Sequence, residues 1–114
     1  MMILLSILID NKQYVVKQCF GLRAIRGLMF DSLMTCDGAL LDGNNIWMPF
    51  VYEPLDLFFL DEAYHVLEKE EAVPITFDPK TWRVYACPKA KYCLELKHGL
   101  VHSFVRIEKI TTLR

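Results

Sequence analysis

Asp56 is the residue of this sequence with the clearest chemical requirement. It follows Leu55 at the start of a run from residue 55 to 60 in which five of the six residues are apolar. Such a run is typical of a strand buried on both faces, where a carboxylate needs a charged or hydrogen-bonding partner. Arg26 is the candidate partner, because a guanidinium group can bind a partly buried carboxylate through two hydrogen bonds. The pair predicts either a structural clamp between a helix and the sheet or one wall of a ligand pocket.

Three further residues extend this candidate site. Trp47, on a predicted strand, could line an apolar pocket or stack on a ligand, although a tryptophan there is also typical of a core. Trp82 and Arg83 fall in a segment bounded by prolines, where a loop could cover a pocket and contact a sugar or an anion. A loop held in place by one aromatic side chain is the simpler alternative. The candidate ligand-binding residues are therefore Arg26, Trp47, Asp56, Trp82 and Arg83.

The other chemical patterns in the sequence are weaker. Two cysteines and two histidines follow one another with the spacing C-x5-C-x4-H-x3-H, at Cys87, Cys93, His98 and His102. A strand over this segment would not bring the four side chains into a tetrahedron, so we expect no metal and no other cofactor. Asp56 and Glu95 could form an acid and base pair as in glycoside hydrolysis. No nucleophile or phosphate-binding motif accompanies them, so an enzyme is the less favoured prediction and catalytic residues stay unassigned.

The elements that must position these residues are mostly strands. The apolar run at residues 1–9, a turn at 10–12 and a mixed run at 13–16 predict a hairpin. Apolar residues recur every three to four positions over residues 22–34, which predicts one short amphipathic helix. Short β-like runs then alternate with turn residues as far as an alternating run at 104–110. We expect seven to eight strands in a small β-sandwich or barrel, since these architectures limit exposed sheet edges.

Length and composition indicate the broad class of protein. The 114 residues, with 54% hydrophobic and 24% charged, predict a single globular domain over residues 1–114. The net charge is −1 and the basic residues are scattered, so nucleic acid is not an expected partner. No stretch approaches the roughly 20 apolar residues of a spanning helix, so we expect a cytoplasmic protein without membrane association. The four cysteines are expected to be reduced thiols, and monomer and homodimer both remain open.

Several landmarks occur in the order that a known family has. They are Arg26-Gly27-Leu28-Met29, Gly38-Ala39-Leu40-Leu41, Trp47-Met48, Pro54-Leu55-Asp56, Phe59-Leu60-Asp61, and Ala90, Tyr92, Leu94-Glu95-Leu96 and Gly99. Over nearly its whole length the chain resembles the family called domain of unknown function 192, an uncharacterised ancient conserved region. The resemblance implies a small β-sandwich or barrel of jelly-roll type with a short helix, and it implies no biochemical activity.

The chain departs from that family pattern in two places. Pro49-Phe50-Val51 stands where the family commonly has Lys-Asn-Thr, and Arg106-Ile107-Glu108 stands where it often has Gly-Asp. The first departure replaces polar side chains by apolar ones. A polar ligand site formed by that triplet elsewhere in the family would therefore not carry over to this chain.

These observations favour a small binding module for a polar or sugar-like ligand, with a pocket between the Trp47 strand and the Trp82 loop. The main alternative is a protein-interaction domain without a pocket, and a small hydrolase or lyase comes third. A concave site lined by Trp47, Tyr52, Trp82 and Arg83 would favour the binding module. An exposed apolar patch of several hundred Å² would favour the interaction domain, and two titratable groups within about 3 Å of one reacting atom would favour the enzyme.

Overall fold

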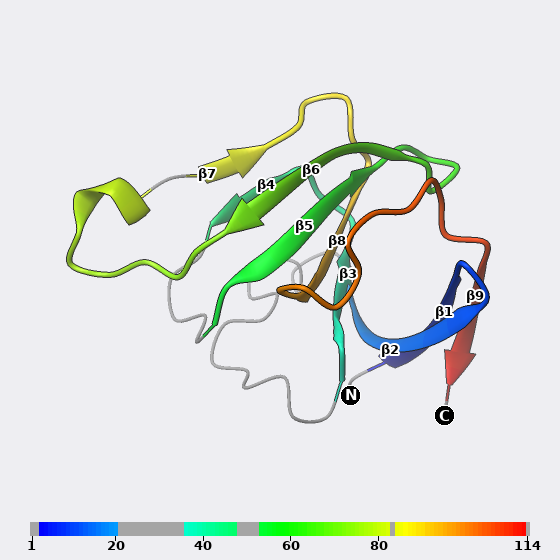
Figure 1. The fold of residues 1–114 in the computed structure, drawn as a ribbon. Helices are drawn as coiled ribbons and strands as arrows, with labels where there is room; N and C mark the ends of the chain where they lie inside the picture. The colour runs from blue at the N-terminus through cyan, green and yellow to red at the C-terminus, as the bar shows by residue number, and fades with distance from the viewer. Residues whose placement is uncertain (1–2, 21–35, 48–52, 83, 114) are drawn as a thin grey trace.

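The computed structural model describes residues 3–20, 36–47, 53–82 and 84–113. In this part of the chain nine strands form a seven-stranded sheet and a two-stranded ribbon (Figure 1). The strands are β1 (Ile3–Ile9), β2 (Lys12–Cys19), β3 (Gly38–Leu41), β4 (Asn45–Trp47), β5 (Leu55–Leu60), β6 (Val66–Ala72), β7 (Val84–Ala86), β8 (Tyr92–Lys97) and β9 (Lys109–Leu113), with one 3-10 turn, η1 (Pro79–Thr81). The predicted mostly-β class is confirmed. The predicted helix at residues 22–34 lies outside the described residues.

The large sheet has the strand order β6-β5-β8-β3-β2-β1-β9, and the ribbon consists of β4 and β7. Its neighbouring strands are antiparallel except for β2 and β3, which run parallel. The predicted hairpin is present as β1 and β2. Its turn residues Asp10 and Asn11 have φ angles of 49° and 67°, as required by the two-residue turn whose twist matches that of the strands. The arrangement is compatible with a small β-sandwich, while the jelly-roll connectivity stays a prediction.

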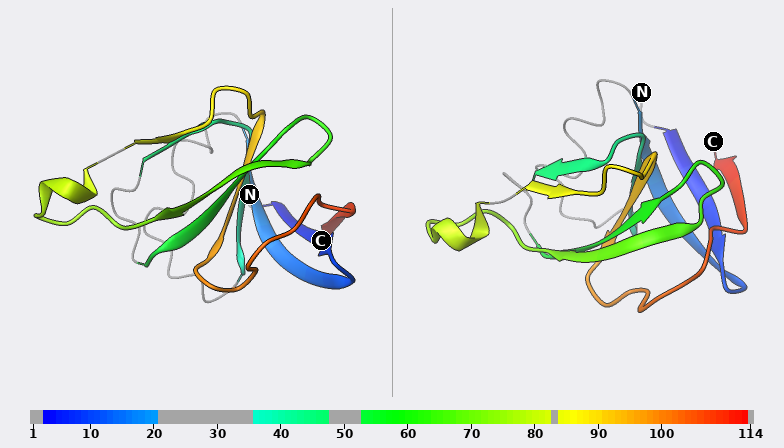
Figure 2. Two further views of the ribbon diagram at one scale, coloured as in Figure 1. Left: turned by 45° about the horizontal axis from the view of Figure 1, so that its top comes forward. Right: turned by 90° about the horizontal axis from the view of Figure 1, so that it is seen from above.

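Sheet and ribbon enclose one of two apolar clusters. The first, which we call the ribbon-side cluster, joins one face of the sheet to the ribbon and contains Ala39, Leu41, Leu57, Phe59 and Cys93 from the sheet and Ile46 and Tyr85 from the ribbon. All four cysteines belong to this cluster and none forms a disulfide. Figure 2 shows the ribbon over one side of the sheet, with the hairpin and β9 at the far end.

The second cluster lies on the opposite face of the sheet, and we call it the hairpin-side cluster. Its buried residues include Leu5, Ile7, Leu40, Phe58, Leu94, Leu96 and Ile107. Because both clusters draw on β3, β5 and β8, these three strands are buried on both faces, as the apolar run at residues 55–60 predicts. None of the described elements is a helix of the length and apolarity that crossing a membrane requires.

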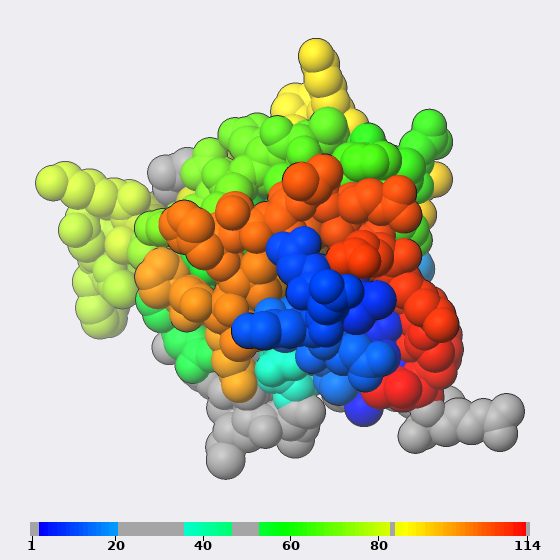
Figure 3. Space-filling view, turned by 45° about the vertical axis from the view of Figure 1, so that its right-hand side comes forward, coloured from blue at the N-terminus to red at the C-terminus, as the bar shows by residue number. Residues whose placement is uncertain are grey.

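The C-terminal part of the chain differs from its predicted strand at residues 104–110. The strand begins later, as β9, and pairs with β1. Figure 3 shows the C-terminal segment, in red, beside the N-terminal segment, in blue. The preceding residues instead cross to the start of β6, where the amide of Val66 donates to Val105 and that of Ile107 donates to Tyr64. Buried Ile107 and half-buried Phe104 join the hairpin-side cluster. The apolar spacing of this segment therefore reflects its packing across the sheet rather than one continuous strand.

The charge run at residues 68–71 lies within β6, at one edge of the large sheet. These residues are paired with β5. Charged side chains on an edge strand discourage pairing with another chain. Glu71, the last acid of the run, lies directly opposite Asp56.

Candidate functional site

Two buried carboxylates lie on neighbouring strands of the large sheet but on opposite faces. In the pairing of β5 with β8, Asp56 lies opposite Leu96 and Leu57 lies opposite Glu95. Because successive side chains of a strand point to opposite faces, Glu95 shares the ribbon-side face with Leu57 while Asp56 shares the hairpin-side face with Leu96. The acid and base pair considered for glycoside hydrolysis is therefore not formed.

Glu95 is the buried carboxylate that has one oxygen without a hydrogen-bond partner among the described residues. The residue is 3% exposed, and among the described residues its Oε1 is the one buried side-chain oxygen or nitrogen without a hydrogen-bond partner. Burial raises the pKa of Glu95 from 4.5 to about 7, against the opposing effect of the positive charge on Lys17. A buried acceptor of this kind costs about 1 to 3 kcal/mol unless something supplies a hydrogen bond.

The register of three strands explains how Lys17 acts on Glu95. Lys17 on β2 lies opposite Ala39 on β3, and Ala39 lies opposite Glu95 on β8. Adjacent strands are about 4.8 Å apart, so the two charged residues are separated by roughly 10 Å of backbone with only a methyl side chain between them. Lys17 is 5% exposed. The sequence thus places an acid and a base in a row inside an otherwise apolar cluster.

Gly38 allows the close approach of β3 and β8 beside this row. A Cβ atom at Gly38 would collide with the backbone oxygen of Glu95. Any other residue at this position would therefore force β3 and β8 apart. This clash explains why the fold requires glycine at position 38, which is one of the family landmarks.

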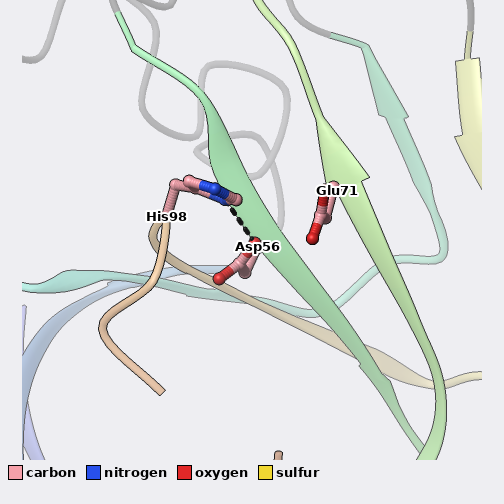
Figure 4. A group of neighbouring side chains, drawn as sticks. All are labelled: Asp56, Glu71 and His98. Carbon is pink, nitrogen blue, oxygen red and sulfur yellow. Dashed lines mark hydrogen bonds and ion pairs between the residues drawn. The ribbon is translucent and has the colours of Figure 1, made fainter. Parts of the chain in front are cut away.

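Asp56, in contrast, has a hydrogen-bond partner for each oxygen. Its Oδ1 lies 2.9 Å from Nδ1 of His98 (Figure 4). Its Oδ2 accepts a hydrogen bond of 2.9 Å from the amide of Gly99. Gly99 has a φ angle of 81°, in the left-handed region that favours glycine. Asp56 therefore ties β5 to the turn after β8. The proposed partner Arg26 lies outside the described residues.

Glu71 completes a small group around Asp56. In the described part of the chain, Asp56, Glu71 and His98 are the only His, Cys, Asp or Glu side chains that bring three ligand atoms within 4.8 Å of one another. The cysteines and histidines of the C-x5-C-x4-H-x3-H pattern do not gather in this way, since Cys87 and Cys93 belong to the ribbon-side cluster while His98 is exposed.

Cys93 and Cys87 of the ribbon-side cluster are poor nucleophiles in this environment. Burial, reinforced by the negative charge of Glu95, raises the pKa of Cys93 well above its usual value of 9.0. Burial also raises the pKa of Cys87, where a hydrogen bond to Glu68 acts in the same direction. Since the thiolate is the reactive form, these thiols are expected to be inert near neutral pH.

Trp82 stabilises the loop between β6 and β7 through a hydrogen bond to another residue of the same loop. Its Nε1 donates a 2.7 Å hydrogen bond to the carbonyl of Thr76, while the residue is 60% exposed. Asp78 caps η1 by accepting from the amide of Lys80. These contacts support the simpler alternative, a loop held by one aromatic side chain, and a role in ligand binding stays a prediction.

The remaining candidate residues are only partly described. The backbone of Trp47 pairs with Val84 in the ribbon, but its side chain lies outside the described residues, as do Arg26, Tyr52 and Arg83. Of the five candidate side chains the structure thus describes Asp56 and Trp82, which contact different partners. Sequence reasoning missed Glu71. It named His98 only within the C-x5-C-x4-H-x3-H pattern and Glu95 only as a catalytic partner of Asp56.

Comparison with known families gives a match over residues 21–108 to the DUF192 model, described as "Uncharacterized ACR". The chain belongs to this family of domain of unknown function 192. The resemblance found in the sequence is confirmed. The family description states no activity, so membership supplies no function for Glu95 or Asp56. No curated protein matches the chain.

Solved structures share the fold at low sequence identity. A protein from Sinorhizobium meliloti 1021, described as a proposed transcription regulator, is 19% identical, with a TM-score of 0.70 over 98% of this chain and 94% of its own. A protein of unknown function from Novosphingobium aromaticivorans DSM 12444 is 17% identical, with a TM-score of 0.65 over 95% of this chain and 85% of its own. Similarity at this level establishes the shared fold alone.

Proposed function

We propose that this DUF192 protein is a binding module for a small polar, sugar-like ligand, and that Glu95 is the residue that recognises it. The observation that carries the proposal is the buried Oε1 of Glu95, which has no hydrogen-bond partner among the described residues. A ligand hydroxyl or amine that donates to this oxygen would remove the desolvation penalty of the acceptor. The site differs from the one that the sequence suggests, because it is centred on Glu95 rather than on Asp56.

The neighbours of Glu95 support a neutral ligand with several donors. Lys17 already contributes a positive charge to the same face, so a second cation is not required to balance the carboxylate. The surrounding residues Ala39, Leu57 and Cys93 are apolar, and binding sites for small molecules combine such walls with few polar groups. The ribbon packs over this face through Ile46 and Tyr85, and an aromatic ring such as that of Tyr85 could stack on a sugar.

A thermal-shift screen over sugars, polyols and other neutral metabolites tests the proposal, with Glu95→Gln as the variant and Glu71→Gln as the control. Glu71 has the same side chain but lies on β6 opposite Asp56, so its replacement leaves the ribbon-side face intact. A ligand present at 100 times its Kd should stabilise the wild type by about 2.7 kcal/mol. The shift should persist in Glu71→Gln and disappear in Glu95→Gln. A flat screen, or a shift retained in Glu95→Gln, would contradict the proposal.

A protein-interaction domain is the second candidate function, and the loop between β6 and β7 favours it. Phe77 is fully exposed at 101%, and Trp82 and Val84 are 60% and 56% exposed. Both views of Figure 2 show the loop with η1 extending away from the rest of the molecule. Replacing Phe77 by Ser should weaken self-association measured by analytical ultracentrifugation if a second copy binds there. Unchanged sedimentation of the wild type and the variant as monomers would remove this support.

The charge and the cysteines of the chain bear on its partners and its location. The net charge of −1 and the scattered basic residues do not support transfer of a transcription role from the Sinorhizobium meliloti protein. A cytoplasmic location is supported by four buried cysteines, none of which forms a disulfide.

A further inference from the structure

Asp56, Glu71 and His98 lie side by side at one end of the large sheet. Glu71 comes from β6, Asp56 from the neighbouring β5, and His98 directly follows β8 on the other side of β5. Figure 4 shows the three side chains turned toward a common point, with Asp56 in the middle. Asp56 is buried, whereas Glu71 and His98 are exposed, so solvent reaches the group from outside.

The spacing of these atoms suits a metal ion. Nδ1 of His98 and Oδ1 of Asp56 are 2.9 Å apart, and all three ligand atoms lie within 4.8 Å of one another. Nitrogen and oxygen ligands bind Zn²⁺ at about 2.0 to 2.2 Å in a tetrahedron, so two ligands of one ion are about 3.4 Å apart. An ion could therefore replace the proton between His98 and Asp56 if their two ligand atoms moved apart by about 0.5 Å.

The buried carboxylate is already oriented for this task. The amide of Gly99 holds Oδ2 of Asp56, which leaves Oδ1 directed at His98. Hydrogen bonds to the outer atom of a ligating carboxylate are the usual means of fixing its orientation. This contact comes from the backbone of a turn and is independent of the charges in the group.

We propose that Asp56, Glu71 and His98 bind one divalent transition-metal ion, with Zn²⁺ as the probe. One imidazole and two carboxylates match ions of intermediate softness, and three protein ligands leave a position for water. The site lies on the face of the sheet opposite Glu95. Its existence therefore does not depend on the ligand-binding function proposed above.

His65 provides an internal control for the histidine. It also faces a carboxylate, with Nδ1 3.6 Å from Oδ1 of Asp61, and both side chains are partly exposed at 45% and 37%. No third ligand atom joins this pair within 4.8 Å among the described residues. If any exposed histidine beside an acid sufficed, both pairs would bind zinc alike.

Isothermal titration of the chelator-treated protein with Zn²⁺ tests the site. The wild type should bind one equivalent of Zn²⁺. His98→Asn and Glu71→Gln should each weaken binding about tenfold or more, because even the loss of a hydrogen-bond partner of a metal ligand lowers metal affinity by about tenfold or more. His65→Asn and Glu70→Gln should bind as the wild type does, because Glu70 precedes Glu71 and points to the other face.

Several outcomes would overturn the proposal. They are absence of saturable binding to the wild type, unchanged affinity in Glu71→Gln, or an equal loss in His65→Asn. Glu71 is exposed and is not one of the two groups hydrogen-bonded to Asp56, so its variant should fold even where a change at His98 weakens the clamp. Amide NMR spectra that overlay on the wild type would confirm folding of each variant.

Discussion

Asp56 and Glu95 occupy neighbouring strands and are almost equally buried, at 1% and 3% exposure, yet their surroundings differ. Asp56 has a partner for both oxygens, from the imidazole of His98 and the amide of Gly99. Glu95 has an oxygen with no partner among the described residues and a pKa raised to about 7. Burial alone therefore does not mark a binding site. Asp56, whose oxygens both have partners, stabilises the fold and is a candidate metal ligand, whereas Glu95, with one oxygen left without a partner, is the candidate for recognising the small polar ligand.

The difference follows from which element faces each carboxylate. Asp56 faces the end of the sheet, where the turn after β8 supplies donors. Glu95 faces the ribbon-side cluster, whose members are apolar apart from thiols and the tyrosine of the ribbon. Lys17 reaches the same face but does not offset the desolvation of Glu95, as the raised pKa shows. Substitutions at the two positions should therefore change stability in opposite directions.

Replacing Asp56 by Ala should have the largest effect. It removes an acceptor of two short hydrogen bonds and leaves the Gly99 amide without its partner. Because hydrogen bonds to charged groups contribute about 1.5 to 3 kcal/mol each, the free energy of unfolding should fall by about 3 to 6 kcal/mol. Urea denaturation measures this loss.

Asp61→Ala is the matched control for that substitution. Asp61 also accepts two backbone hydrogen bonds, from Ala63 and His65, but its side chain is 37% exposed. Water can replace the lost bonds there, so the loss of stability should be smaller. Equal losses at Asp56 and Asp61 would contradict the view that Asp56 is a buried clamp.

Replacing Glu95 by Gln should stabilise the protein at high pH. A folded-state pKa above the unfolded one means that the folded state binds more protons between pH 4.5 and about 7. The stability of the wild type should therefore fall as pH rises through this window, by about 3 kcal/mol in total, and level off above it. The variant lacks this contribution, so it should match the wild type near pH 4 and exceed it at pH 8.

The measurement is the difference in unfolding free energy between wild type and Glu95→Gln as a function of pH. The difference cancels the contributions of other groups, such as Asp61, whose lowered pKa acts in the opposite direction. A flat difference for Glu95→Gln would show that its carboxyl is already compensated.

Replacing Trp82 by Phe should have the smallest effect. It removes the hydrogen bond to Thr76, but the residue is 60% exposed, so the cost should be about 1 kcal/mol or less. Thermal unfolding measures this cost. The pKa of Glu95 should not change, because the described contacts of Trp82 lie within its own loop. A change of about one unit or more would show that the loop covers the Glu95 site.

Part of this arrangement could be predicted from the sequence. The run at residues 55–60 indicated a strand buried on both faces, and that burial required a partner for Asp56. The partner was not predictable, because His98 is 42 residues away and meets Asp56 only through the pairing of β5 with β8. Local periodicity carries no information about which strands become neighbours.

The burial of Glu95 could not be predicted from its own strand, and the reason is physical. The alternation around Glu95 resembles a strand with one apolar and one mixed face, which is typical of half-buried strands. In the fold β8 lies between β3 and β5, and the ribbon covers its second face. The burial of Glu95 therefore arises from its central place in the sheet rather than from any feature of its own strand.

Titration of the Glu95 side-chain carboxyl by ¹³C NMR tests the central claim most directly. The assigned resonance follows the ionisation of this one group, and Glu95→Gln identifies it by its disappearance. The account predicts a midpoint near the value of about 7 that burial gives this carboxyl. A midpoint near the ordinary value of 4.5 would show that Glu95 is satisfied within the fold and would contradict its role as the ligand-recognising group.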